Sequence, residues 1–315
     1  MNSLSRRLAL AFHEESHDDE IFSNPASTDQ APANPNMFVS TSLAEEIDLA
    51  EARLTHAIGR ALENQGTRDG LLVRQLAGGV VVYAGPMSPM SKLIGVGFHG
   101  MPTSEELGRI EDHFDSRQAP LQAELSTFSD PAFGRLLATR GYLLEGFENV
   151  LGRPLDAADA LPSAPEGMLI RQMAPHEDRL WLEESINGFG HADAQGIAAP
   201  ELPPRELLES ALEGFLLAPD FLRFGAWIDG ELAGVCCLRL DGKLAQLCGA
   251  TTLPRFRRLG VQSALLRQRL AVAVAAGCTL ALMTTQPGSK SHQNGCRLGF
   301  VQLLNRALLV RPPGP

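Results

Sequence analysis

The residues best suited to chemistry in this chain lie in one segment that is rich in arginine and contains a glycine. Residues 253–263 read LPRFRRLGVQS, between an apolar run that ends at Thr252 and a helical pattern that reaches about residue 276. A helix that begins here leaves its first backbone N–H groups unpaired, and its dipole adds partial positive charge. Gly260 lets an anion approach the backbone because it has no Cβ, while Arg257 and Arg258 add charge. The segment therefore predicts a site for a pyrophosphate.

The same segment resembles a known family signature. Arg257-Arg-Leu-Gly260-Val-Gln262 is similar to the Arg/Gln-x-x-Gly-x-Gly/Ala motif with which GCN5-related N-acetyltransferases bind the pyrophosphate of acetyl-CoA. Gln262 departs from the second small position, so its side chain is expected to point away from the cofactor. Taken alone, the motif also fits an arginine-rich helix start on the surface. The resemblance implies acetyl-CoA as co-substrate, held by Ala250, Thr251, Thr252, Arg257, Arg258, Leu259, Gly260, Val261, Gln262, Ser263 and Ser291.

The patterns around the motif predict elements in the order of the acetyltransferase fold. Strands are expected at 168–173, 222–228, 232–240, 244–252 and 279–285, helices at 175–189, 205–216, 261–276 and 289–297, and two terminal strand runs to residue 311. Asp229-Gly230 and Asp241-Gly242 are typical of hairpin turns. Gly299-Phe300 also resembles the family's Gly-Phe after its last helix. The resemblance covers about residues 167–312.

Composition favours an ordinary soluble enzyme. The 315 residues suffice for two domains, and a net charge of −10 lacks the electrostatic footprint of a nucleic-acid-binding protein. No apolar run approaches the roughly 20 residues that span a bilayer, and the apolar stretch after Arg6-Arg7 is too short for a signal peptide. The five cysteines contain no Cys-x-x-Cys pair, so buried free thiols are expected and no metal site is predicted. We expect a cytoplasmic monomer or homodimer without nucleic-acid or membrane partners.

The chain divides at two polar, proline-containing stretches. Residues 1–36 have almost nothing to bury and read as a disordered tail, and residues 155–166 read as a linker. Between them, residues 37–154 fall within the second domain, residues 167–315, when the sequence is shifted by 158 positions: Gly141 falls on Gly299, and Arg153 falls on Arg311. We therefore expect an α/β (α+β) protein of two tandem acyl-CoA N-acyltransferase-like domains, each with a mixed central sheet flanked by helices.

The first domain is predicted to be degenerate. Under the same shift Pro102, which has no N–H, falls on Gly260, and neither arginine has a counterpart. Thr103-x-x-Glu106 forms a capping box that satisfies the helix end internally. Nearby, residues 95–100 match Gly-x-Gly-x-x-Gly, the dinucleotide fingerprint. However, Val96 and Phe98 look like strand residues and the helix begins only after Pro102, so nicotinamide or flavin binding is the weaker alternative.

If the resemblance holds, the reaction is direct transfer of an acetyl group from the thioester to an amine. The strand end at residues 250–252 would splay from residues 279–285 to admit the pantetheine arm, and backbone groups near Thr252 would polarise the thioester carbonyl. An ammonium must lose a proton before it attacks. Some family members carry a glutamate where this chain has Gln246, which cannot take a proton but could hold a water. An ordinary polar strand residue is the other interpretation of Gln246.

The sequence also leaves open which residue acts as general acid. Many relatives use a tyrosine five residues before the Phe of Gly-Phe to protonate the departing thiolate, and this chain has Gly295 there. Cys296 is the nearest titratable side chain, although a buried structural thiol is the simpler interpretation. Ser291 and His292 begin the same helix and could contact the cofactor or the leaving sulfur.

Acceptor residues are expected between the first two helices of the second domain. Glu184 ends a helical run and His191 lies in a glycine-rich stretch, so either could meet an ammonium, although a solvated loop is the plainer role for each. Candidate acceptors are small amines, amino acids and peptide N-termini. The alternative functions are an acyl-CoA-binding module without turnover, because the tyrosine and the glutamate are missing, and a dinucleotide-binding enzyme.

Overall fold

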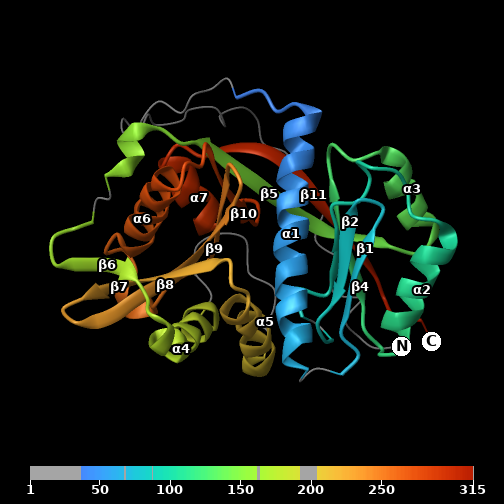
Figure 1. Ribbon diagram of the computed structural model, residues 1–315, viewed down its shortest axis with the longest axis horizontal. Coiled ribbons are helices and arrows are strands. Elements are labelled where there is room, and N and C mark those ends of the chain that lie inside the picture. The colour runs from blue at the N-terminus through green and yellow to red at the C-terminus, as the bar shows by residue number, and fades with distance from the viewer. Residues whose placement is uncertain (1–36, 67–68, 87, 162–163, 192–203, 315) are drawn as a thin grey trace, which may run out of the picture. The chain divides into compact units, whose positions relative to one another are not determined.

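The computed structural model describes residues 37–66, 69–86, 88–161, 164–191 and 204–314 (Figure 1). The predicted tail, residues 1–36, lies outside these. The N-terminal half contains helices α1 (Thr41–Gln65), α2 (Ser104–Asp115) and α3 (Pro131–Thr139), and strands β1 (Leu72–Leu76), β2 (Gly79–Tyr83), β3 (Lys92–Ile94), β4 (Leu121–Ser126) and β5 (Leu143–Pro154). A short 3-10 turn, Ala157–Ala160, follows in the predicted linker.

The C-terminal half repeats this alternation with two helices before its first hairpin. Its helices are α4 (Asp178–Phe189), α5 (Arg205–Leu217), α6 (Val261–Ala275) and α7 (Lys290–Arg297). Its strands are β6 (Met168–Gln172), β7 (Phe221–Ile228), β8 (Glu231–Asp241), β9 (Leu244–Thr252), β10 (Leu280–Thr285) and β11 (Val301–Arg311). Asp229 and Gly230 both have positive φ, 51° and 82°, which is why the β7–β8 hairpin turns so tightly. None of these helices is both long and apolar enough to cross a bilayer.

The described strands form one mixed sheet in which the two halves exchange their last strands. Its order is β1-β2-β3-β4-β11-β5-β10-β9-β8-β7-β6, so β11 sits beside β4 and β5 sits beside β10. β3–β4 and β9–β10 are parallel, whereas the other neighbours are antiparallel. The fold class predicted from the sequence, a tandem α/β arrangement with a mixed sheet, is confirmed. The exact domain boundaries stay a prediction.

The repeat found in the sequence is visible in the strand register. Ala123 of β4 lies opposite Leu309 of β11, and Ala281 of β10 lies opposite Arg153 of β5. A strict 158-residue shift would place Leu151 opposite Ala281, so the two registers differ by two residues. An even offset keeps each side chain on its own face of the sheet, and the two cores are therefore unaffected by it.

Helices cover both faces of the sheet. On one face, α1, α4 and α5 bury a shared apolar cluster that includes Ile58, Trp181 and Leu212. On the other face, α6 packs on the C-terminal half around Leu265, while α2 and α3 pack on the N-terminal half around Phe114. Because α1 belongs to the first half and contacts α5 of the second, the shared cluster joins the halves.

Two local expectations were wrong. The two terminal strand runs are one strand, β11, whose register shifts near residues 303 and 308 interrupt the period-2 pattern in the sequence. Val96 and Phe98 do not extend β3, because Gly95 and Gly97 adopt positive φ and turn the chain away from the sheet. The helix after this loop begins at Ser104, as expected, so the glycines do not form a strand-to-helix phosphate turn.

Candidate active site

The N-terminus of α6 is open to an anion. Gly260 is the N-cap with φ 82° and ψ 4°, and among the described residues no side-chain cap bonds the first turn. The backbone N–H groups of Val261, Gln262 and Ser263 begin this helix, where the dipole places partial positive charge. A residue with a Cβ would be strained at Gly260 because of its positive φ. The geometry that the motif predicted is therefore present.

The two arginines before α6 differ in what they do. Arg257 is tied to the protein: its Nη2 donates to the carbonyl of His191 at 2.5 Å, and its Nε donates to the carbonyl of Thr252 at 3.4 Å. Arg258 is exposed and has φ 67°, and Leu259 beside it is 51% exposed. Arg257 thus shapes the loop, and Arg258 presents the charge.

The side chain of Gln262 forms a hydrogen bond with a neighbouring helix. Its Oε1 accepts a hydrogen bond from Nδ2 of Asn294 on α7. The side chain that departs from the family signature therefore links α6 to α7. Ser263 is half-buried in the same turn, and Ser291 is half-buried in the first turn of α7.

Beside this helix start, β9 and β10 separate. Their parallel pairing ends at Gln246 and Leu282, and β9 continues to Thr252 without a partner on that side among the described residues. A cavity of about 180 Å³ opens at the separation. Further along β9, outside the cavity lining, Thr252 Oγ1 is buried without a hydrogen-bond partner in the described part of the chain. The predicted splay of residues 250–252 from β10 is thus present.

A bulge shapes β9 at the cavity. Val235 of β8 pairs with Thr251, but Cys237 pairs with Cys248, so one residue of β8 faces two of β9. Arg269 of α6, only 1% exposed, donates from Nη1 to the carbonyls of Cys237 at 3.1 Å and Cys248 at 3.3 Å. These bonds tie α6 to both strands next to the bulge. The helix whose N-terminus is predicted to bind the anion therefore also contacts the bulge.

The cavity wall combines apolar side chains with a few polar groups. Two of the polar groups come from opposite halves: Glu51 from α1 and Gln246 from β9. Gln246, 5% exposed, accepts at Oε1 from Nη1 of Arg239 at 2.7 Å and donates from Nε2 to Glu51 at 3.4 Å. Apolar groups supply most of the rest, from Ile47, Leu54, Met90, Val150, Phe215, Leu247, Leu282 and Met283.

Glu51 belongs to a buried ionic cluster beneath α1. Lys92 Nζ lies 2.9 Å from Glu124 and 3.5 Å from Glu51. Burial opposes ionisation of Glu51, but the charges of Lys92 and Arg306 outweigh it and lower its pKa. Arg306 is itself paired with Asp48 at 2.8 Å. Glu51 is therefore an anion at neutral pH.

Another carboxyl of the cluster behaves differently. Glu148 of β5 lies opposite Arg306 in the β5–β11 ladder. Burial, followed by repulsion from Glu124, raises the pKa of Glu148 from 4.5 to about 7. Glu148 therefore titrates in the physiological range, whereas Glu51 does not.

The residues considered for the acid, Cys296 and Ser291, do not line the cavity, whereas Gln246 does. Cys296 is exposed on α7, so the expectation of a buried thiol is wrong there; Cys236, Cys237 and Cys278 are buried. Gly295 is the residue of this turn that faces inward, because a Cβ there would meet Met283 Sδ at 2.9 Å. Since neighbouring helical residues point in different directions, Cys296 faces solvent. His292 Nδ1 lies 3.2 Å from Nδ2 of Asn149 on β5.

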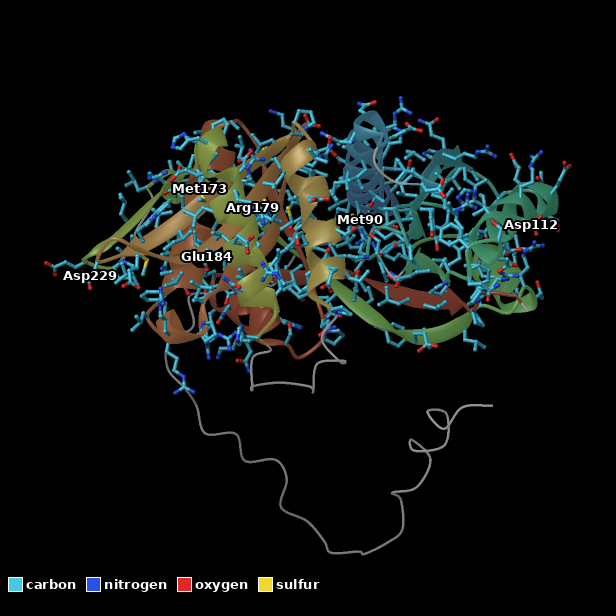
Figure 2. All side chains as sticks on the ribbon, turned by 90° about the horizontal axis from the view of Figure 1, so that it is seen from below. Met90, Asp112, Met173, Arg179, Glu184 and Asp229 are labelled. Atoms are coloured by element: carbon cyan, nitrogen blue, oxygen red, sulfur yellow. The ribbon has the colours of Figure 1, made fainter. Side chains whose placement is uncertain are left out.

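The predicted acceptor residues lie at the end of α4. Glu184 Oε2 accepts from Asn187 at 3.4 Å, and His191 Nδ1 lies 2.6 Å from the carbonyl of Asn187. Neither residue lines the cavity. Figure 2 shows Glu184 on α4, well apart from Met90, which does line it. A role for either in acceptor binding stays a prediction.

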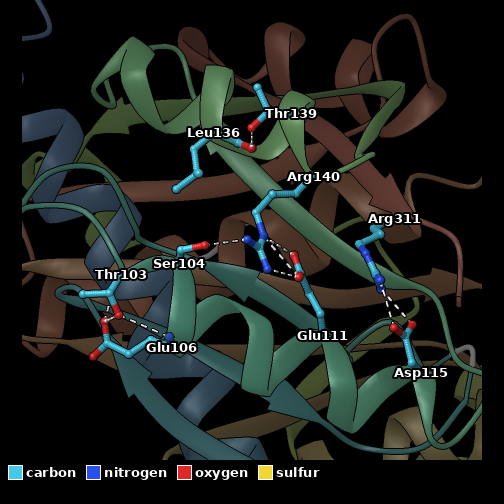
Figure 3. Close-up of polar contacts among 9 residues, drawn as sticks. All are labelled: Thr103, Ser104, Glu106, Glu111, Asp115, Leu136, Thr139, Arg140 and Arg311. Atoms are coloured by element: carbon cyan, nitrogen blue, oxygen red, sulfur yellow. Dashed lines mark hydrogen bonds and ion pairs between the residues drawn. The ribbon is translucent and has the colours of Figure 1, made fainter.

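The equivalent helix start in the first half is closed. Thr103 accepts from the N–H of Glu106 at 3.2 Å, and Glu106 Oε2 accepts from the N–H of Thr103 at 2.8 Å (Figure 3). The capping box predicted from the sequence is thus confirmed. Nε2 of His99 lies 2.5 Å from Oε1 of Glu45 on α1. This half offers no open helix terminus at that position.

Sequence reasoning missed Glu51, Arg239 and Arg269. Glu51 lies nearly 200 positions before Gln246, so no local spacing could pair them. Arg239 looks like an outward residue of a strand, and Arg269 like a polar position on an amphipathic helix. One signal was available: Arg269 lies four residues after Leu265 and four before Ala273, which places it on the apolar face of α6.

Comparisons with known proteins agree with this geometry. Residues 191–300 match the model of the acetyltransferase (GNAT) family. The chain contains a GNAT domain. Members of this family are acyltransferases, and the fold implies an acyl-CoA as co-substrate. The matched residues include α6 with its open N-terminus and the separated strands β9 and β10.

Solved structures support the tandem fold. A GCN5-related N-acetyltransferase from Kribbella flavida has 17% identity, covers 89% of this chain and 98% of its own, and has a TM-score of 0.58. A tandem GNAT protein from the clavulanic acid biosynthesis pathway has 14% identity, covers 91% of each chain and has a TM-score of 0.55. A functionally unknown protein from Staphylococcus epidermidis has 13% identity, covers 79% and 97%, and scores 0.53. No curated protein sequence matches this chain. At these identities the neighbours show the fold alone.

Proposed function

We propose that the protein is an N-acetyltransferase that moves an acetyl group from acetyl-CoA directly to an amine of a small molecule or peptide. The observation that carries this proposal is the position of the open N-terminus of α6 beside the separation of β9 and β10. The first feature suits the pyrophosphate, and the second suits the pantetheine arm and the thioester.

The residues present fit this co-substrate. The N–H groups of Val261, Gln262 and Ser263 would hold the pyrophosphate, and Arg258 would add charge. The Thr252 hydroxyl, which has no hydrogen-bond partner among the described residues, lies on the stretch of β9 that β10 does not pair, where it could bond the pantetheine arm. Backbone N–H groups at the β9 bulge, fixed by Arg269, would polarise the thioester carbonyl. When bound, acetyl-CoA supplies the activated acetyl group.

The remaining steps concern protons. The acceptor must be neutral when it attacks, so its proton must leave first. Gln246 cannot accept that proton, and Glu51, held ionised, is a weak base. A water or a group of the ionic cluster would have to accept it. The departing CoA thiolate needs no strong acid because thiols of ordinary pKa leave well near neutral pH. Cys296, exposed and turned outward, does not suit the role of acid; Ser291 stays the candidate contact on α7.

A non-catalytic acyl-CoA-binding module is the second candidate. It is favoured by Gly295, which leaves the position of the usual tyrosine without a side chain. Tyr83 and Tyr142, each 3% exposed, are buried in the core of the other half and cannot replace it.

Thermal unfolding with acetyl-CoA, NAD or FAD, followed by CoA release across a panel of amines, separates the candidates. The proposal expects acetyl-CoA to raise Tm and at least one amine to release CoA. A raised Tm without release for any amine favours the binding module. Stabilisation by NAD or FAD but not by acetyl-CoA overturns both. A thiol-reactive assay needs a control without amine, because Cys296 is itself exposed.

A further inference from the structure

The cavity at the strand separation contains a carboxylate that the second half does not encode. Gln246 stands on β9 where some relatives carry a glutamate, and its amide donates to Glu51 Oε2 at 3.4 Å. Glu51 comes from α1 of the first half and lines the same cavity. The negative charge missing from the strand is thus supplied from the other half.

We propose that Glu51 binds the ammonium group of the acceptor, and that the acceptor is a compact primary amine with an apolar body. The first half is then part of the acceptor site rather than only a cover for the sheet. This inference rests on the proposed function, because it names the acceptor of the same site.

The contacts of Glu51 leave room for another hydrogen-bond donor. Its Oε1 is 3.5 Å from Lys92, and its Oε2 is 3.4 Å from Gln246, both at the long limit for a hydrogen bond. Lys92 has a closer partner in Glu124, at 2.9 Å. The carboxylate of Glu51, 18% exposed, is therefore ionised and only loosely bonded. A buried anion in that condition gains from a cation that reaches it.

The rest of the cavity selects the body of the ligand. Arg306, a cation on the wall, is paired with Asp48, and this carboxylate offsets part of its repulsion of an ammonium. Leu54, Met90 and Phe215 are among the apolar side chains that line the space. Polar groups on the acceptor would lose water there without finding partners, which is costly. A cavity of about 180 Å³ also excludes long polyamines and peptides from its interior.

Glu51 also has a structural role, as second counterion of Lys92. The test must therefore separate loss of the binding charge from loss of the ion pair. Glu124 provides the matched control, because it contacts Lys92 more closely, is 2% exposed and does not line the cavity. Position 246 provides a rescue, because Arg239 already donates to it at 2.7 Å and would pair with a carboxylate there.

The experiment measures binding of 3-methylbutylamine by calorimetry, in the presence of CoA, to the full-length wild type and to Glu51→Gln, Glu124→Gln and the double variant Glu51→Gln/Gln246→Glu. Glu51→Gln should weaken binding at least about tenfold, Glu124→Gln less than about threefold, and the double variant should recover most of the loss. Ethanolamine and spermidine should bind the wild type more weakly than 3-methylbutylamine. Far-UV spectra and Tm identify any variant that has not folded.

Unchanged binding in Glu51→Gln overturns the proposal, as does an equal loss in Glu124→Gln. Absence of rescue in a folded double variant, or a preference for the polar amines, also overturns it. Because the readout is binding, it does not depend on turnover. A protein that binds 3-methylbutylamine through Glu51 but releases no CoA would refute the transferase activity and leave the amine site standing.

Discussion

In both halves a helix begins at the same point of the repeat, but its N-terminus is capped in the first half and open in the second. α2 connects β3 to β4, and α6 connects β9 to β10, each pair being parallel. At α2, Thr103 and Glu106 satisfy each other and the helix end. At α6, Gly260 takes the N-cap position and leaves the N–H groups open. The residue before the helix therefore decides whether its first N–H groups are capped or open.

The two pairs of parallel strands differ in a similar way, one being open where its strands separate and the other closed. Where β9 and β10 separate, the C-terminal half has a cavity. At the corresponding junction of β3 and β4, Lys92 and Glu124 form an ion pair whose side chains are 7% and 2% exposed. The closed junction and the capped helix agree with the prediction that the first half is degenerate, and we propose that its contribution to the site is Glu51 of α1.

The largest effect is expected at Gly260. Of the residues with a Cβ, Asp and Asn adopt positive φ most readily and can cap the open N–H groups, so these two variants are the least strained at this position. Asp also places a negative charge within a few ångströms of the pyrophosphate, which costs on the order of 3–4 kcal/mol at an effective dielectric near 20. We expect Gly260→Asp to weaken acetyl-CoA binding at least about 100-fold, and Gly260→Asn clearly less.

The neutral variant is the control for that charge, and calorimetry on both gives the comparison. Equal losses in the two variants would mean that filling the N-cap, not charge, governs binding. Unchanged binding in Gly260→Asp would remove the anion from this helix start altogether.

A smaller effect, on the pH dependence of stability, is expected for Glu148, which lies where the halves meet. The pKa of Glu148 is raised from 4.5 to about 7, so the folded protein holds a proton that the unfolded chain has released. This group is therefore favourable for folding at low pH, and its contribution falls as pH rises from about 4.5 to 7. Glu148→Gln should remove that dependence, gaining on the order of 1–3 kcal/mol relative to wild type between pH 5 and 8.

Urea unfolding of both proteins across this range measures the difference, and carboxyl groups that do not interact with Glu148 cancel because both chains share them. Parallel curves of stability against pH for wild type and Glu148→Gln would show that Glu148 is not the titrating group.

The smallest effect is expected at the closed helix start. Thr103→Ala removes one side of the capping box and should cost about 1 kcal/mol, seen as a fall in Tm of a few degrees. Acetyl-CoA affinity should stay the same, because α2 does not carry the anion site. A change in that affinity of more than about threefold would contradict the division of roles between α2 and α6.

Much of this could be predicted from local sequence. Period, turns and caps gave the element order, the open start at Gly260 and the capped one at Thr103, because these depend on residues a few positions apart. The single strand β11 could not be predicted, since its register shifts hide the alternation. The exchange of β5 and β11 depends on pairing across the repeat, which no local pattern encodes. For the same reason the Glu51–Gln246 contact was invisible, and the exposure of Cys296 depended on which face of a short helix packs inward.

The most direct test of the central claim is the stoichiometry of acetyl-CoA binding, measured by calorimetry on the full chain. One open and one closed helix start predict a single site per chain in the wild type, severely weakened in Gly260→Asp and unchanged in Thr103→Ala. Two sites per chain, or a single site that survives Gly260→Asp and disappears in Thr103→Ala, would contradict the account.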